Sequence, residues 1–160
     1  MEHLVWIIPL AIVVLLVLWA IGAYNGLVNR RNAAKNAWSQ IDVQLKRRYD
    51  LIPNLVETAK GYMKHEKETL ENVIRARQQA VDLRNAGNIG ELVKADGALT
   101  QSLSRLFAVA EGYPDLKANT NFLELQKELA NTENRIQAAR RFYNGNVREN
   151  NNRIEQFPSN

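Results

Sequence analysis

The sequence contains no cysteine, and its only histidines are His3 and His65. Disulfides, thiolate nucleophiles and lipid attachment through cysteine are therefore excluded. His65-Glu66 begins like a zinc metalloprotease motif, but Thr69 stands where the second histidine is required. The Glu-x-x-His pairs that bind two metals inside helical bundles are also missing. We predict no metal site and no cofactor.

The loops and nucleophile turns of common enzymes are missing as well. The eight glycines never take the spacing of a phosphate-binding or dinucleotide-binding loop, and Gly-x-Ser-x-Gly does not occur. Carboxylates such as Glu124 and Glu128 stand at the spacing of neighbours on a helix surface, which favours pairing with a nearby lysine. We predict that the protein is not an enzyme.

Charge of one sign is never concentrated in a block. The formal net charge is +4, but no tract of five or more consecutive bases occurs, and no aromatic-rich strand pattern accompanies the bases. We therefore predict no nucleic-acid partner.

What the sequence does have is one long segment without charge, residues 4–24, rich in Leu, Val, Ile and Trp. At about 1.5 Å per residue, a helix of this length covers roughly 30 Å, the thickness of a hydrocarbon core. A cleaved signal peptide is the alternative, but its start should be basic, and this one reads Met1-Glu2-His3. We predict a transmembrane anchor over residues 1–26. The aromatic residues expected at its two membrane surfaces are Trp6, Trp19 and Tyr24.

The flanks of this segment predict its orientation. No Lys or Arg precedes it, whereas Arg30, Arg31 and Lys35 follow it closely. The positive-inside rule then places the N-terminus outside and the C-terminal body in the cytoplasm. Arg30 and Arg31 are also expected to act as anchors at the membrane interface, through attraction to anionic lipid headgroups.

Beyond Gly26, apolar residues recur at alternating spacings of three and four, which predicts helices nearly throughout. Pro53 interrupts the first stripe. Because proline lacks an N–H and disfavours helical geometry in the residue before it, we expect a break between Asp50 and Pro53, with Asp50 capping a new helix. Gly61 is the alternative position for this break.

Later interruptions at Asn85–Asn88 and Gly112–Pro114 separate further helices, and Pro158 ends the last one. Short connections between long amphipathic helices predict antiparallel neighbours. The predicted fold is all-α: one N-terminal transmembrane helix, then an antiparallel up-and-down bundle of three or four long helices over residues 27–160.

The predicted core stripes include several polar residues. We prefer the interpretation that each of them lies at the edge of its stripe and reaches water. The alternative is a set of buried polar layers that fix register or partner choice. These residues are Glu66, Asp96, Gln126, Glu133, Asn150 and, near the same face, Arg140.

Two long stretches, Asn36–Val56 and Leu106–Asn119, together with Thr132–Ile136 and Ala139–Asn144, closely resemble the LemA family of bacterial membrane proteins. The resemblance covers essentially the whole chain. It implies a helical bundle on a single-pass anchor in the bacterial inner membrane, and it supplies no agreed activity or catalytic residues. Relatives in magnetosome-forming bacteria are linked to building membrane compartments. Members usually continue with a short apolar, glycine-containing tail, whereas this sequence stops at Asn160.

The leading functional hypothesis is a non-enzymatic, membrane-anchored helical scaffold that forms homo-oligomers and organises membrane or partner proteins. Aromatic residues and arginine are enriched at contact hot spots. On that basis the candidate interaction residues are Trp38, Arg47, Arg48, Tyr49, Tyr113, Arg140, Arg141 and Tyr143.

Two alternatives remain open at this point. One is a monomeric adaptor or regulator of a membrane enzyme, such as a quality-control protease. The other is catalysis by a metal held on the Glu66 and Glu133 carboxylates. For each interaction residue taken singly, an aromatic core position or a solvated arginine is the favoured interpretation.

Overall fold

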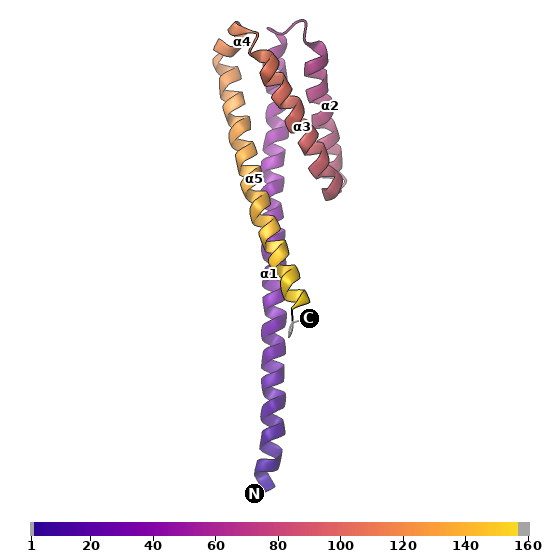
Figure 1. The fold of residues 1–160 in the computed structure, drawn as a ribbon, viewed down its shortest axis with the longest axis vertical. Helices are drawn as coiled ribbons and strands as arrows, with labels where there is room; N and C mark the ends of the chain where they lie inside the picture. The colour runs from indigo at the N-terminus through magenta and orange to yellow at the C-terminus, as the bar shows by residue number, and fades with distance from the viewer. Residues whose placement is uncertain (1, 157–160) are drawn as a thin grey trace. The chain divides into compact units, whose positions relative to one another are not determined.

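The computed structural model describes residues 2–156, with side chains from Trp6 onward, and this part of the chain contains helices and no strand. The helices are α1 (Glu2–Lys60), α2 (Lys67–Asn85), α3 (Ile89–Ala110), the short α4 (Pro114–Ala118) and α5 (Thr120–Glu155). The predicted all-α fold is confirmed, with a long apolar N-terminal helix followed by helices that pack together (Figure 1). Pro158, the predicted end of the last helix, lies outside the described residues.

The chain forms two compact units. Unit 1 comprises Met1–Asp42 and Gln137–Asn160, and unit 2 comprises Val43–Ile136. Both α1 and α5 therefore contribute residues to each unit. The predicted division at residue 26 falls inside unit 1, where α1 is uninterrupted. As a division between a membrane part and a soluble part, it stays a prediction.

The N-terminal part of α1 exposes its apolar side chains. Trp6 is 78% exposed, and the large aliphatic residues from Ile7 to Ile21 are all exposed by about half or more. Among the described residues, α1 is the one helix long and apolar enough, by length and composition, to cross a membrane. An exposed apolar surface of this extent marks a site of membrane or protein contact.

The interior of unit 2 is built from the apolar stripes that the sequence shows. Leu45, Ile52 and Leu55 of α1 are almost fully buried, at spacings of seven and three. Burying such a side chain contributes roughly 1.5–3 kcal/mol each. The same stripe pattern buries Val73 of α2 and Leu99 of α3, and Figure 1 shows α2 and α3 running side by side in opposite directions.

The predicted break between Asp50 and Pro53 is wrong, because α1 continues to Lys60 and the interruption falls at Gly61. A helical proline leaves the carbonyl four residues earlier without its usual donor. Here that carbonyl belongs to Tyr49, and it accepts a 2.8 Å hydrogen bond from Nε of Arg77 on α2. A contact from another helix therefore compensates the loss, and α1 passes through the proline.

The predicted interruption at Asn85–Asn88 is confirmed. Gly87 adopts a φ of 69°, a left-handed conformation that side-chain-bearing residues rarely take. Asn88 then caps α3, because its side-chain oxygen accepts a 3.2 Å hydrogen bond from the backbone N–H of Glu91. The turn between α2 and α3 is thus encoded locally, unlike the passage through Pro53.

Candidate functional site

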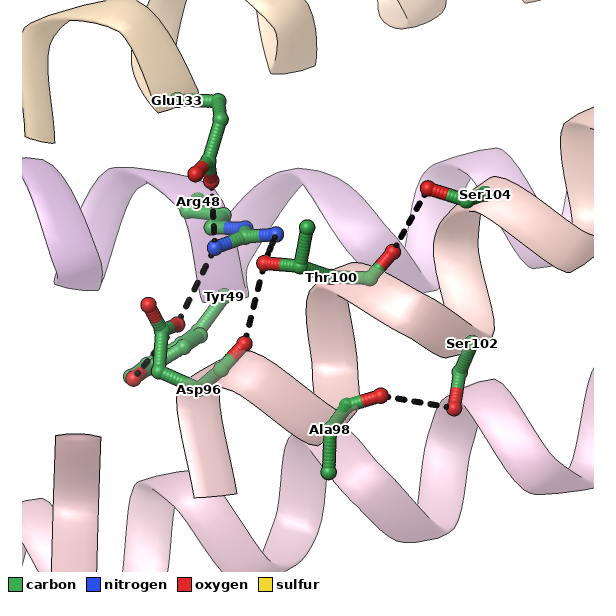
Figure 2. Close-up of polar contacts among 8 residues, drawn as sticks. All are labelled: Arg48, Tyr49, Asp96, Ala98, Thr100, Ser102, Ser104 and Glu133. Atoms are coloured by element: carbon green, nitrogen blue, oxygen red, sulfur yellow. Dashed lines mark hydrogen bonds and ion pairs between the residues drawn. The ribbon is translucent and has the colours of Figure 1, made fainter. Parts of the chain in front are cut away.

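A charged cluster lies in the interior of unit 2 (Figure 2). Arg48 of α1 is only 2% exposed. Its Nη1 lies 3.1 Å from Oδ1 of Asp96 on α3 and 2.7 Å from Oε2 of Glu133 on α5. Its Nη2 donates a 2.8 Å hydrogen bond to Oγ1 of Thr100. One guanidinium therefore joins three helices.

Asp96 is held from several sides. It is 1% exposed, and besides Arg48 its Oδ1 accepts a 3.4 Å hydrogen bond from the hydroxyl of Tyr49. The hydroxyl of Thr100 in turn donates a 3.0 Å hydrogen bond to the Asp96 carbonyl. A buried carboxylate needs such partners, since an unpaired charge in a protein interior is strongly destabilising. The cluster can hold the bundle in one register, because Arg48 pairs with both carboxylates.

The preferred interpretation of the polar stripe residues is wrong for Asp96, which belongs to a buried polar layer. The other five are only partly buried, as expected of residues at the edge of a stripe. Sequence reasoning also missed the burial of Arg48. The signal was present, because Arg48 stands seven residues after Ile41 and four before Ile52, both members of the apolar stripe.

The structure places the predicted interaction residues of unit 2 in different surroundings. Arg48 and Tyr49 are interior, so their side chains are not on a surface that a partner can reach. Arg47 is 54% exposed and pairs with Glu128. Tyr113 is half-buried, and its hydroxyl donates a 3.3 Å hydrogen bond to Glu66. Partial burial, followed by the charge and hydrogen bonding of Glu66, raises the pKa of the Tyr113 phenol.

In unit 1, two of the predicted residues meet each other. The rings of Trp38 and Tyr143 lie with centroids 5.7 Å apart in a tilted arrangement. Arg140 is half-buried and Arg141 is exposed. For the residues that remain on a surface, the contact role stays a prediction.

The expected anchors at the membrane interface are also in unit 1. Trp6, Trp19 and Tyr24 are exposed along α1, as is Arg31. Arg30 differs, because its Nη1 lies 2.5 Å from Oε1 of Glu149 on α5. One base of the first basic cluster after the apolar segment therefore forms an ion pair with the last helix.

Unit 2 has a groove that sequence reasoning missed. It has a volume of about 1050 Å³ and lies along the end of α1 and the first half of α2. No sequence pattern indicated it, because periodicity does not tell whether a third helix covers an apolar stripe. The apolar residues are Pro53, Val56, Met63, Leu70 and Ile74, and the charged ones are Glu57, Lys60, Lys64, Lys67, Glu71 and Arg75.

No group of three or more His, Asp or Glu side chains is arranged to hold a metal ion in the described part of the chain. Glu66 and Glu133, the carboxylates of the metal hypothesis, lie in separate contacts with Tyr113 and Arg48.

Comparison with known proteins gives a match to the model of the LemA family over residues 37–160. Protein LemA of Metamycoplasma hominis is 30% identical over 142 residues, which cover 88% of this chain and 63% of that protein. Magnetosome protein MamQ of Magnetospirillum gryphiswaldense is 23% identical over 158 residues, with coverages of 84% and 58%. Magnetosome protein MamQ 2 of Paramagnetospirillum magneticum is 24% identical over 181 residues, with coverages of 99% and 66%. The chain thus spans about three fifths of the length of these curated relatives.

Proposed function

The chain belongs to the LemA family, and we propose that it is a non-enzymatic, membrane-anchored scaffold that self-assembles at the bacterial cell membrane. The observation that carries this proposal is the exposed apolar part of α1, which leads without interruption into the helices of the bundle. A helix with such a surface is stable in a bilayer and not in water. The relatives named for the magnetosome support a role in organising membranes.

The proposed topology has the N-terminus outside and the bundle in the cytoplasm. Its support is the asymmetry of charge, with no Lys or Arg before the apolar segment and three soon after it. Labelling an introduced cysteine in intact cells tests this directly, since the native chain has none. A cysteine at position 2 should react with an impermeant maleimide, and one at position 105 should not.

For self-assembly, the proposed contact residues are those predicted from the sequence that stay on a surface. Arg141 and its exposed neighbour Phe142 combine arginine with an aromatic ring, two residue types that are enriched at protein interfaces. In unit 2, Arg47 offers a further half-exposed guanidinium. None of these positions has to leave a buried environment to meet a second copy.

The mass of the full-length protein in native lipid nanodiscs, measured by mass photometry, tests the proposal. The chain has a mass of 18.2 kDa, so a self-assembling scaffold should give discrete higher multiples of that mass after subtraction of an empty disc. Arg141→Glu should lower the assembly, whereas Arg105→Glu, the same charge change on an exposed residue of α3, should leave it intact. A monomer in the wild type contradicts self-assembly.

The groove favours one second candidate function, an adaptor for another membrane protein. Its charged rim contains four bases and two acids, and each acid lies within 4 Å of one base, Glu57 with Lys60 and Glu71 with Lys67. The two remaining bases, Lys64 and Arg75, suit an amphipathic partner helix with acidic flanks. A monomer with one stoichiometric companion, lost on Ile74→Asp, would support the adaptor and exclude the scaffold.

A further inference from the structure

Unit 1 brings the end of α5 to the point where α1 leaves its apolar segment. Gly26 and Arg30 follow Tyr24 by two and six residues, or about 3 Å and 9 Å along the helix axis. The headgroup region of a bilayer extends about 5–8 Å beyond the hydrocarbon core on each side. In an inserted helix Gly26 therefore lies at headgroup level, and the long side chain of Arg30 reaches back into that layer.

The contacts of α5 at this level are specific. Nη1 of Arg153 lies 3.7 Å from the place that a Cβ on Gly26 would occupy. One turn away, Nη1 of Arg30 lies 2.5 Å from Oε1 of Glu149. The 3.7 Å distance at Gly26 is an ordinary van der Waals contact, so the Arg153 guanidinium lies directly beside α1 there. The last turns of α5 therefore pack on α1 just past the apolar segment (Figure 1).

Between these residues is a pocket of about 370 Å³. Its lining combines two guanidinium groups, a side-chain amide and small residues, and its one acid is the Glu149 that contacts Arg30. Arginine presents five N–H donors, so one contact with Glu149 leaves most of the Arg30 fork for another acceptor. The planar guanidinium fork matches the geometry of a phosphate group. The lining residues are Gly26, Asn29, Arg30, Ala33, Glu149 and Arg153.

We propose that this pocket binds the phosphate of an anionic glycerophospholipid in the leaflet on the side of the bundle. The inference rests on the proposed membrane anchorage and adds a ligand to it. Anionic lipid is favoured over zwitterionic lipid because bases outnumber acids in the lining of the pocket and in the parts of α1 and α5 that belong to unit 1 outside the apolar segment. In residues 25–42 and 137–156 the bases are Arg30, Arg31, Lys35, Arg140, Arg141, Arg148 and Arg153, and the acids are Asp42, Glu149 and Glu155.

Lipid binding by the full-length chain in detergent micelles, read by native mass spectrometry with added phosphatidylglycerol, tests the pocket. Arg30→Gln and Arg153→Gln should each weaken binding about five-fold, the effect of one basic residue at an anionic membrane surface. Arg148→Gln removes the same charge from an exposed residue of α5 outside the pocket and should change binding less than about two-fold. Equal losses in all three variants would show diffuse attraction and overturn the site.

A further variant changes the packing beside the pocket and keeps every charge. The Cβ of a residue at position 26 would already contact Nη1 of Arg153, so the longer side chain of Gly26→Leu should displace this guanidinium. Binding should weaken as much as in Arg153→Gln, with unchanged helix content by circular dichroism. Binding at the wild-type level in this variant would contradict the close packing that forms the pocket.

Two further ligands show whether the bound phosphate belongs to an anionic lipid, a zwitterionic lipid or a soluble phosphate ester. Phosphatidylcholine should bind more weakly than phosphatidylglycerol, and equal binding would overturn the preference for anionic lipid. Glycerol 1-phosphate should not displace bound phosphatidylglycerol at equal concentration. Displacement would show that the pocket takes soluble phosphate esters, and it would overturn the lipid assignment.

Flotation with phosphatidylcholine vesicles keeps this inference distinct from the proposed function. The anchor alone should bring the wild type and all four variants to the vesicle fraction. If none of them floats, membrane anchorage fails. If all float but lipid retention is the same in every variant, the pocket fails and the anchorage stands.

Discussion

The two units of the chain are stabilised in different ways. Unit 2 has an almost solvent-free interior, with Ile52, Leu55 and Leu106 at 0% exposure and a charged cluster enclosed among such residues. In unit 1, the large apolar side chains of α1 from Trp6 to Tyr24 are exposed, and the contacts with α5 include an ion pair and an aromatic pair. This difference fits the proposed function, in which unit 1 contacts the membrane and unit 2 folds in water. Substitutions in unit 2 should change folding stability. Substitutions in unit 1 should change membrane insertion and lipid binding.

The sharpest test of this contrast is Arg48→Ala in unit 2. It leaves the buried Asp96 carboxylate without its cation, which should destabilise the folded protein by about 3–5 kcal/mol. The control is Arg47→Ala, its neighbour in the sequence, whose half-exposed pair with Glu128 should contribute about 1 kcal/mol or less. Urea unfolding of the full-length protein in micelles measures both values. Equal losses would show that the buried cluster is not special.

The matching test in unit 1 is Val14→Arg, near the middle of the apolar segment. A charge at the centre of a membrane helix costs about 2.5–3.5 kcal/mol of insertion free energy. The variant should be lost from the membrane fraction, while the urea midpoint of unit 2 stays at the wild-type value. Val43→Arg, on an exposed residue of unit 2, should leave membrane binding intact. A shifted urea midpoint in the Val14 variant would break the proposed separation between the units.

A smaller effect is expected where α1 passes through Pro53. Arg77→Met removes the hydrogen bond to the Tyr49 carbonyl and should destabilise unit 2 by about 1–3 kcal/mol. Pro53→Ala restores a backbone N–H at position 53, so in that background Arg77→Met should cost clearly less. A double-mutant cycle by urea unfolding gives this difference. An unchanged cost would show that Arg77 stabilises the bundle in some other way.

The smallest effect concerns Tyr113, on the surface of unit 2. Its pKa is raised in the folded state, so its contribution to stability is present below the ordinary tyrosine pKa of 10.0 and is lost as the pH rises through the higher folded value. The wild type should therefore lose more stability than Tyr113→Phe between about pH 10 and pH 12. Thermal unfolding at a series of pH values measures this. Identical profiles would show that the contact with Glu66 is not made in solution.

Much of the fold could be predicted from local sequence, because the signals are local. The uncharged run, the three-and-four spacing and the Gly87-Asn88 turn each act over a few residues. The break at Pro53 was mispredicted because the Tyr49 carbonyl that proline leaves without a donor is hydrogen-bonded by Arg77. That residue stands twenty-four residues after Pro53, on another helix. The groove was missed for a related reason, since a stripe has the same period whether or not a third helix covers it.

The candidate sites show the same limit. Trp38 and Tyr143 were selected as residue types, and only the structure paired them. Arg48 looked like a surface base because arginine is seldom buried, and its burial depends on Asp96 and Glu133, which come from two other helices.

By itself, the sequence determined that the chain is helical, where its apolar segment lies and where the local turn after α2 falls, because periodicity, charge and turn chemistry act over short distances. The tertiary structure alone decided which polar groups form hydrogen bonds or ion pairs with one another. It let α1 continue through a proline, enclosed an arginine with two carboxylates, and brought Arg153 to Gly26. The physical reason is that a buried or helix-end polar group must find a partner, and in this chain those partners stand far away in sequence.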